Sequence, residues 1–258
     1  MKRLDVFLVE SGAFSSREKA KEAILAGQVL VSGKVAKASM LVDENSQIEI
    51  LQTEHYVSRG AKKLLHAVEC FDFTFENKVV VDIGASTGGF TQVALEHGAS
   101  KVYSVDVGQG ELAQILREDP HVVNLENHDF RALTKDDLSG ANIAISDVSF
   151  ISLRHILPKI NEILGKIECI LLFKPQFECG KDVARKFKGV VLDKKLHLSL
   201  LRDFIAYAQG LGFTIRNLTP SPIHGKEGNI EYLFHLNGTN QKQVNVDEVV
   251  TTAFNTKK

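Results

Sequence analysis

Between residues 79 and 90 the sequence carries a motif that can bind a nucleotide-like ligand. The run Val79-Val80-Val81-Asp82-Ile83 is mostly apolar and β-branched, and a glycine-rich turn and a predicted helix follow it. In doubly wound α/β domains such a strand, turn and helix hold a cofactor. Glycines leave out the Cβ atoms where the backbone turns tightly and approaches the ligand. We therefore predict that the cofactor is bound by Asp82, Gly84, Ser86, Thr87, Gly88, Gly89 and Phe90.

The spacing of the glycines distinguishes between kinds of cofactor. A dinucleotide site needs GxGxxG, whereas this loop reads GxxxGG, with Ser86 and Thr87 where a pyrophosphate loop usually has glycine. Asp106 ends the next predicted strand, 24 positions after Asp82, where a carboxylate can hold ribose hydroxyls. This pattern favours a ligand that contains adenosine and no phosphate.

The run DIGASTGGF resembles the S-adenosylmethionine loop of class I methyltransferases, in their FtsJ-like ribose 2′-O-methyltransferase branch. Nearly the whole chain resembles the TlyA, or hemolysin A, family of ribosomal RNA methyltransferases. The matching motifs are Tyr56-Val57-Ser58-Arg59-Gly60, Ser146-Asp147-Val148-Ser149-Phe150, Lys174-Pro175-Gln176-Phe177-Glu178 and Gly228-Asn229-Ile230-Glu231.

The resemblance implies roles for six further residues. Members of the family use a Lys-Asp-Lys-Glu tetrad, which here corresponds to Lys63, Asp147, Lys174 and Glu231. Lys62 stands directly before the first of these lysines. By the same resemblance Asp129 and Phe130, after the third strand, hold the adenine. The implied substrates are cytidine riboses in ribosomal RNA of the small subunit, the large subunit or both.

The chemistry of methyl transfer to a ribose agrees with these roles. A ribose hydroxyl is a poor nucleophile near neutral pH, so it needs alignment with the methyl donor and a group that accepts its proton. Asp147 and Lys174 follow the fourth and fifth predicted strands, at the sheet edge where the cofactor is expected. We infer that Lys174 is the base, with a pKa lowered by Lys63 and partial desolvation, and that the other three residues hold the geometry. Ordinary surface salt bridges are the alternative interpretation.

Other methyltransferase chemistries and a metal site lack the residues they need. Methylation of an exocyclic amine usually uses Asn/Asp-Pro-Pro-aromatic, but Val148-Ser149-Phe150 follows Asp147. Cytosine carbon methylation needs a cysteine nucleophile, and Cys179 has no second cysteine in a Pro-Cys context, so we interpret it as a bystander. The nine histidines show no HxH or HExxH spacing, so we predict no metal.

The elements that must position these residues form an alternating pattern. Short β-branched runs separated by helical stretches predict a mainly parallel sheet. The fold class is therefore α/β: a class I Rossmann-like methyltransferase domain, expected over 60–258, with a small N-terminal α+β RNA-binding domain. The strands are expected at 79–83, 102–105, 122–125, 143–145, 169–173, 213–218 and 232–236, and helices at 60–70 and 246–254.

Residues 1–51 are expected to form the RNA-binding domain, followed by a polar linker over 52–59. Two short helices are predicted, the first ending at Gly12 and the second running from Arg17 to Ala26 after a cap at Ser15-Ser16, then strands at 29–31 and 48–50. The order of glycines and the Ser16-Arg17 pair resemble the αL RNA-binding motif of a small-subunit ribosomal protein, apart from Ser32, where asparagine is common. Phosphate contacts are expected from Arg3, Arg17, Lys19 and Lys34.

Composition and charge limit the remaining possibilities. The formal net charge of -1 means that any RNA surface is a local patch, and three widely spaced cysteines indicate reduced thiols. No apolar run approaches the roughly 20 residues that span a bilayer, so we expect a cytoplasmic protein without a membrane partner. Two alternatives remain open: an RNA-binding ribosome-assembly factor with a vestigial cofactor site, and a membrane-active hemolysin. The oligomeric state is not indicated.

Overall fold

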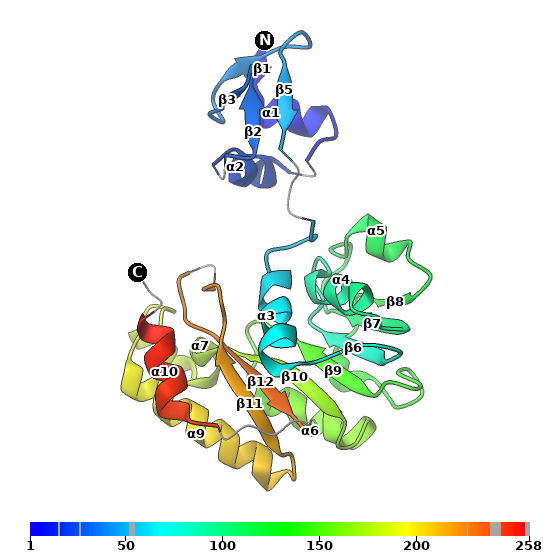
Figure 1. The fold of residues 1–258 in the computed structure, drawn as a ribbon, viewed down its shortest axis with the longest axis vertical. Coiled ribbons are helices and arrows are strands. Elements are labelled where there is room, and N and C mark those ends of the chain that lie inside the picture. The colour runs from blue at the N-terminus through cyan, green and yellow to red at the C-terminus, as the bar shows by residue number, and fades with distance from the viewer. Residues whose placement is uncertain (15, 26, 52–54, 226, 238–243, 256–258) are drawn as a thin grey trace. The chain divides into compact units, whose positions relative to one another are not determined.

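The chain divides into two compact units, Met1–His55 and Tyr56–Lys258. The computed structural model describes residues 1–14, 16–25, 27–51, 55–225, 227–237 and 244–255 (Figure 1). The predicted linker, 52–59, overlaps the division between the units, and its residues 52–54 lie outside the described residues, as do Ser15 and Ala26 of the predicted second helix and its cap.

The N-terminal unit packs two short helices against small antiparallel sheets. The helices are α1 (Leu4–Glu10) and α2 (Arg17–Leu25), and the strands are β1 (Lys2–Arg3), β2 (Val29–Val31), β3 (Lys34–Val35), β4 (Leu41–Val42) and β5 (Ile48–Ile50). Strand β1 pairs with β4, and β2 lies between β3 and β5. The core holds Leu4, Leu8, Ile24 and Val29, which are all at most 2% exposed. Two predicted helices and the strands at 29–31 and 48–50 are thus confirmed.

Local signals in the sequence set the ends of these elements. Gly12 has φ +76°, a conformation that favours glycine, and its N–H donates to Val9 O at 3.0 Å, so it follows α1 as predicted. The Ser16 hydroxyl oxygen accepts from Lys19 N at 3.3 Å and caps α2. Ser32 and Gly33 both have positive φ and form the turn between β2 and β3, so the serine serves where asparagine is common.

The larger unit is built on a sheet of seven strands in the order β11-β12-β10-β9-β6-β7-β8. Strands β6 to β10 run parallel, and β12 is antiparallel to both neighbours, β10 and β11. The predicted mainly parallel, doubly wound sheet is therefore confirmed. Its strands are β6 (Val79–Ile83), β7 (Lys101–Val105), β8 (Val122–Leu125), β9 (Ile143–Ser146), β10 (Glu168–Phe173), β11 (Ile215–Pro220) and β12 (Tyr232–Leu236).

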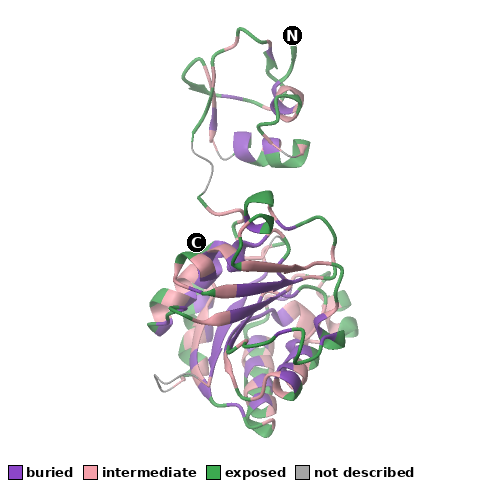
Figure 2. Ribbon diagram, turned by 90° about the vertical axis from the view of Figure 1, so that its right-hand side faces the viewer, coloured by how far each residue is buried: buried purple, intermediate pink, exposed green. Residues whose placement is uncertain are grey.

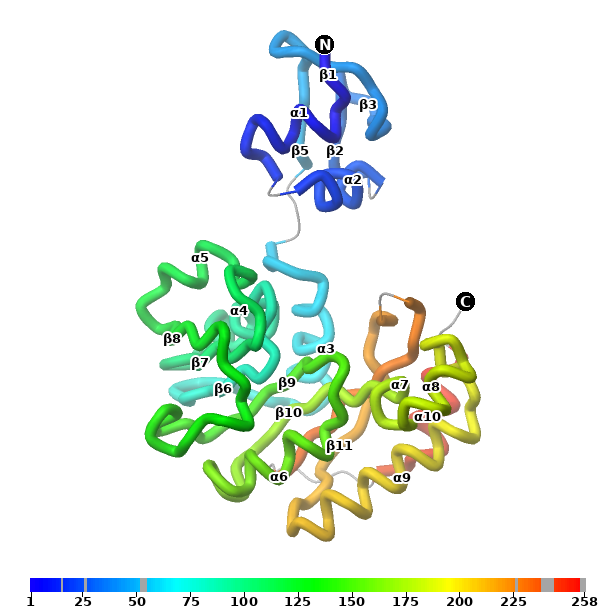
Figure 3. The backbone as a smooth tube through the Cα atoms, turned by 180° about the vertical axis from the view of Figure 1, so that it is seen from behind, coloured from blue at the N-terminus to red at the C-terminus, as the bar shows by residue number. Residues whose placement is uncertain are grey.

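Helices cover both faces of this sheet. On one face α3 and α4 pack over a cluster that includes Phe71, Phe90 and Ile143; on the other, α6, α9 and α10 pack over a cluster that includes Phe173 and Phe204. Figure 1 shows α3 in front of the strands, and Figure 3 shows α6 and α9 from the other side. The helices are α3 (Ala61–Phe71), α4 (Gly89–Glu96), α5 (Gln114–Arg117), α6 (Leu153–Ile163), α7 (Pro175–Glu178), α8 (Lys181–Lys186), α9 (Lys194–Gly210) and α10 (Val246–Asn255), with a 3₁₀ turn η1 (Phe130–Ala132).

The central strands are the most continuously buried part of the unit (Figure 2). All four residues of β9 and all five of β12 are buried, as expected for strands that are covered on both faces. None of the helices within the described ranges is long and apolar enough to cross a membrane.

Candidate active site

The loop after β6 has the backbone of a tight turn that only small residues can follow. Gly84 and Gly88 have φ of +83° and +93°, a region that L side chains rarely adopt. A Cβ atom on Gly84 would stand 3.1 Å from the Val148 Cα, and one on Gly89 would stand 2.1 Å from the Ser58 Oγ. Glycine is therefore favoured at Gly84 and Gly88 by the backbone conformation, and the loop packs closely against the segments after β9 and before α3.

Asp106 ties this loop to the end of β7. Its Oδ2 accepts from Ser86 N at 2.8 Å, and its Oδ1 accepts from Gly108 N at 2.7 Å. The Ser86 hydroxyl donates to Glu111 at 3.0 Å. The backbone N–H that a phosphate group would need is thus already bound to a carboxylate, and the surrounding charge is negative. Because each carboxylate oxygen has a second lone pair, Asp106 can still accept from ribose hydroxyls. These residues fit an adenosine ligand without phosphate.

Asp82 lies beneath the loop and has no exposed surface. The Thr91 hydroxyl donates to its Oδ2 at 2.7 Å, which holds α4 against the end of β6. Burial raises the pKa of Asp82 to about 7, since the charged form is poorly solvated there. Of the predicted cofactor residues in this stretch, Gly88, Gly89 and Phe90 are also buried, whereas Ser86 is exposed and Gly84 and Thr87 are partly exposed.

Asp129 and Phe130 follow β8 at the same edge of the sheet. Asp129 caps η1 by accepting from Arg131 N at 2.9 Å, and its pKa is lowered chiefly by its hydrogen bonds with the Arg131 side chain. Phe130 is only 3% exposed, because its ring packs in the core. What Phe130 can offer a ligand is consequently its main chain.

The four residues of the predicted tetrad come together in one cluster of ion pairs. The Lys63 Nζ lies 2.8 Å from Glu231 Oε2 and 3.3 Å from Asp147 Oδ2, and the Lys174 Nζ lies 2.7 Å from Asp147 Oδ1. Lys63, Lys174 and Glu231 are at most 7% exposed. Such burial distinguishes the cluster from ordinary surface salt bridges, which contribute little.

The topology of the sheet explains why these distant residues meet. Asp147 and Lys174 directly follow the parallel strands β9 and β10, so both lie at the carboxyl edge. Glu231 directly precedes β12, whose first residue Tyr232 pairs with Phe173 at the end of β10. Because β12 is antiparallel, its beginning lies at the same edge. Lys63 reaches the cluster from α3.

The charges make Lys63 a structural cation. Burial alone would lower its pKa, but Asp147 and Glu231 outweigh burial, and the pKa is raised. The side chain stays protonated between two carboxylates. The neighbouring Lys62 is exposed, so the two adjacent lysines differ in burial.

Two residues in the family motifs, Ser149 and Glu178, have contacts that the motifs themselves did not indicate. The Lys174 Nζ donates to the Ser149 Oγ at 2.8 Å, so this exposed serine faces the predicted base. The Glu178 carboxylate accepts from the Ser152 hydroxyl at 2.5 Å and from Leu153 N at 2.7 Å. Glu178 thereby joins the segment after β10 to the start of α6. Neither role follows from spacing, since both partners lie about 25 residues away.

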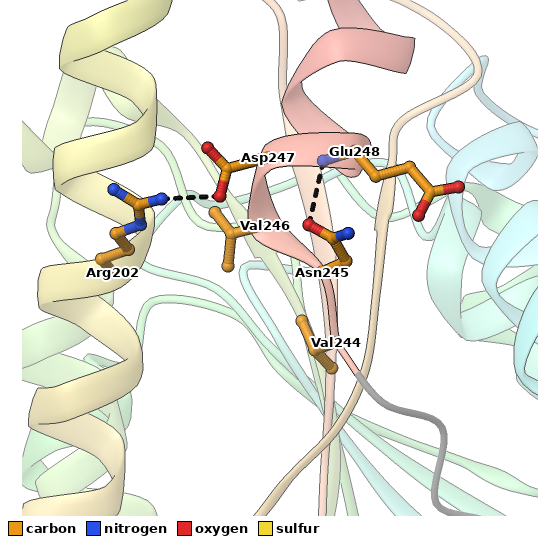
Figure 4. A pocket seen from close by; sticks show the side chains of 6 residues that line it. All are labelled: Arg202, Val244, Asn245, Val246, Asp247 and Glu248. Carbon is orange, nitrogen blue, oxygen red and sulfur yellow. Dashed lines mark hydrogen bonds and ion pairs between the residues drawn. The ribbon is translucent and has the colours of Figure 1, made fainter.

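Other predicted or visible features lie apart from this chemistry. Burial raises the pKa of the Cys179 thiol, which opposes nucleophilic use. Within the described residues no group of three or more His, Cys, Asp or Glu side chains is placed to hold a metal ion. A hollow beside the start of α10 is lined by Val244 to Glu248 and Arg202 (Figure 4), but Arg202 is paired with Asp247 at 2.6 Å. We assign no function to this hollow.

The residues of the N-terminal unit that are predicted to contact RNA lie in or beside its two helices and one turn. Arg3 precedes α1, Arg17 and Lys19 lie in the first turn of α2, and Lys34 follows the turn between β2 and β3. Lys19 and Lys34 are exposed. Arg3 and Arg17 both bind the carboxylate of Asp5, at 3.0 and 2.9 Å.

The sheet order and the site define a class I, Rossmann-like methyltransferase. Residues 56–238 match the FtsJ-like methyltransferase model and residues 2–48 match the S4 domain model. The chain therefore belongs to the FtsJ-like methyltransferase family, in the branch that carries an N-terminal S4 domain and includes TlyA and hemolysin A.

Relatives cover nearly the whole chain. Hemolysin A of Brachyspira hyodysenteriae is 42% identical over 90% of this chain and 98% of its own length. The 16S/23S rRNA (cytidine-2′-O)-methyltransferase TlyA of Mycobacterium tuberculosis is 39% identical over 91% of this chain and 89% of its own. A solved structure from Streptococcus thermophilus, provisionally named a hemolysin, is 38% identical with a TM-score of 0.77 and covers 99% of this chain and 96% of its own. The resemblance expected from the sequence motifs is confirmed.

Proposed function

We propose that the protein methylates ribose 2′-oxygens of ribosomal RNA, with S-adenosylmethionine as the methyl donor. The observation that carries the proposal is the buried cluster of Lys63, Asp147, Lys174 and Glu231 at the carboxyl edge, next to the loop after β6. The M. tuberculosis relative is named for transfer to cytidine in 16S and 23S RNA. We accordingly propose cytidine as the acceptor, in one or both subunits.

Bound at the loop, S-adenosylmethionine supplies an electrophilic methyl group on a sulfonium. We propose that Asp106 binds its ribose hydroxyls and that Asp129 and the main chain of Phe130 bind its adenine. Gly84, Ser86 and Thr87 line the binding site in this proposal. Asp82, Gly88, Gly89 and Phe90 are buried, so they support the shape of the loop from beneath. The negative charge of Asp106 and Glu111 suits a cationic ligand better than an anionic one.

Lys174 takes the proton of the 2′-hydroxyl in this proposal. Its Nζ has one carboxylate partner and one neutral hydroxyl partner, Ser149, whereas the Lys63 Nζ has two carboxylates. Lys63 and Glu231 hold Asp147, and Asp147 aligns Lys174. Alignment of this kind supplies much of the rate enhancement when no covalent intermediate forms.

The S4 domain is proposed to dock on folded RNA through its cations, among them Arg3, Arg17, Lys19 and Lys34. Contacts to phosphate position the RNA and do not read its sequence. Ribosomal subunits as substrate would place the enzyme in the cytoplasm. The unit boundaries support an arrangement of an RNA-binding domain ahead of a catalytic domain.

The test is transfer of labelled methyl groups to purified small and large ribosomal subunits, followed by mapping of 2′-O-methylated nucleotides. We expect label at one or a few cytidines that stay unmodified without the protein. Label on bases, or cofactor binding without any transfer to either subunit, would contradict the proposal. The second outcome would favour an RNA-binding assembly factor.

A further inference from the structure

A buried carboxylate of the S4 domain gathers three cations at the surface. Asp5, in the first turn of α1, is fully buried. Its Oδ1 lies 3.0 Å from Arg3 Nε, and its Oδ2 lies 2.9 Å from Arg17 Nη2 and 3.9 Å from Lys21 Nζ. The three cationic side chains are 47%, 49% and 44% exposed, so each reaches solvent beside the buried anion.

Helix geometry selects which lysine of α2 joins the group. Arg17 and Lys21 are four residues apart and share one face of the helix, whereas Lys19 lies on nearly the opposite side. The distances agree, since Lys21 approaches Asp5 and Lys19 has no ion pair with it. Of the two lysines of α2, Lys21 is thus the one held beside Arg17 and the carboxylate that binds Arg3.

The bonds to Asp5 leave most donors of the arginines available. A guanidinium carries five N–H groups. Arg3 directs its Nε and one Nη2 hydrogen toward Asp5, and Arg17 directs one Nη2 hydrogen. The pKa of Asp5 is held well below its usual range, first by the hydrogen bond from Arg3, although burial acts in the opposite direction. The carboxylate stays charged and fixes the three side chains.

The second carboxylate near this group is bound elsewhere. Glu18 is exposed, and its pKa is lowered first by its hydrogen bond with its own backbone and then by the Ser16 hydroxyl, ahead of the charges of Lys21 and Arg17. Three cations therefore lie around Asp5, and Glu18 is held chiefly by hydrogen bonds outside this group.

We propose that Asp5 is a positioning residue that assembles Arg3, Arg17 and Lys21 into a site for one phosphate group of RNA. The inference rests on the proposed RNA-binding function and adds Lys21 and Asp5 to it. Long cationic side chains lose conformational freedom when they bind a ligand, and a carboxylate that orders them beforehand reduces this loss. Charge alone predicts the opposite effect of Asp5 on RNA affinity, because an anion at an RNA-binding surface should weaken binding.

The decisive comparison uses Asp5→Asn and Glu18→Gln in the full-length protein. Both substitutions remove one negative charge from the same surface without changing side-chain size. We measure equilibrium binding to purified ribosomal subunits, without cofactor, across a series of KCl concentrations. Glu18→Gln should bind as tightly as the wild type or more tightly. Asp5→Asn should bind about threefold to tenfold more weakly, with a shallower salt dependence as a phosphate contact is lost.

A second pair covers the possibility that Asp5→Asn unfolds the domain, which circular dichroism and thermal melting would reveal. Lys21→Ala and Lys19→Ala remove the same charge from the same helix, at a partly exposed and an exposed position. Lys21→Ala should weaken binding severalfold more than Lys19→Ala does. Equal effects of the two lysine variants, or a folded Asp5→Asn that binds like Glu18→Gln, would overturn the inference.

The two proposals fail in different ways. If the wild type binds and methylates the subunits while the four variants bind as predicted by charge alone, only the positioning role of Asp5 is refuted. If the wild type neither binds nor methylates them, the proposed function falls, and this inference falls with it.

Discussion

Replacing Lys63 with methionine should damage both the stability of the larger unit and methyl transfer. Lys63 is 6% exposed and, within the described residues, is the one ion-pair partner of Glu231, at 2.8 Å. Methionine keeps the length and apolar character of the lysine stem but removes the cation. The substitution therefore leaves the carboxylates of Glu231 and Asp147 facing each other without the charge between them.

The size of the expected loss of stability follows from the burial of Glu231. Removing one partner of a buried ion pair destabilises a protein by about 3–5 kcal/mol, because the remaining charge is left poorly solvated. Glu231 has a 3% exposed side chain, so solvent screening reduces this little. Relaxation of the surrounding side chains and entry of water make this figure an upper bound. For a unit of this size about 1 kcal/mol shifts Tm by about 2–4 °C, so the expected decrease is at most about 6–20 °C.

The matched control is Lys62→Met, which changes the adjacent, exposed lysine in the same way. It should alter stability by no more than about 0.5 kcal/mol. Scanning calorimetry at pH 7 measures both variants, and single-turnover transfer to ribosomal subunits measures the chemistry. Lys63→Met should lose about a hundredfold or more in rate, because Asp147 is no longer held opposite Lys174. Similar Tm values and rates for the two variants would refute the assignment of Lys63 as the cation that holds the cluster.

Three further perturbations have defined outcomes. Lys174→Ala should abolish methyl transfer while the dissociation constant for S-adenosylmethionine, measured by calorimetry, stays near the wild-type value; retained turnover contradicts its role as base. A chain of residues 56–258 should fold and bind cofactor but methylate subunits at least about tenfold more slowly, since about 1.4 kcal/mol of docking energy suffices for that, and undiminished activity contradicts docking by the S4 domain. The folded state binds a proton at Asp82 more tightly than the unfolded state does, because burial raises the pKa to about 7. The free energy of unfolding therefore falls by about 4 kcal/mol as the pH rises from about 4 to above 7. Asp82→Asn should consequently gain stability relative to the wild type between pH 5 and 8 in thermal melts, and a difference independent of pH contradicts the buried, titrating carboxyl.

The sheet was predictable because its signals are local. Runs such as Val79–Ile83 and Tyr232–Leu236 are apolar at four of their five positions, and the structure has strands with these bounds. Strand β11 begins at Ile215 and not at Phe213, whose ring packs in the core after the turn that ends α9. Strands β1 and β4 have two residues each and exist only through pairing of Lys2 with Val42 and Arg3 with Leu41, which no local pattern indicates.

In the candidate site, too, some features could be predicted from local sequence and others could not. Asp106, Asp147 and Lys174 stand at strand ends, so the topology alone brings them to one edge of the sheet. The burial of Lys63 could not be predicted from its helix, since it depends on Asp147 and Glu231, which are 84 and 168 positions away. For Asp82, which was predicted to bind the cofactor, the place at the end of a strand did not indicate its full burial or its hydrogen bond from Thr91.

The asymmetry of the cluster gives the four residues different roles. Both lysines pair with Asp147, and among the described residues Lys63 has a second carboxylate partner, Glu231, whereas Lys174 has none. The Lys174 Nζ also contacts the hydroxyl of the exposed Ser149 and lies 5.6 Å from the centre of the Phe177 ring, and neither group carries a charge. A group that must release a proton, accept another and face the substrate needs the weaker pairing. A group that only fixes geometry needs the stronger pairing. The positions of Lys174 and Lys63 correspond to these two requirements, and this supports Lys174 as the base.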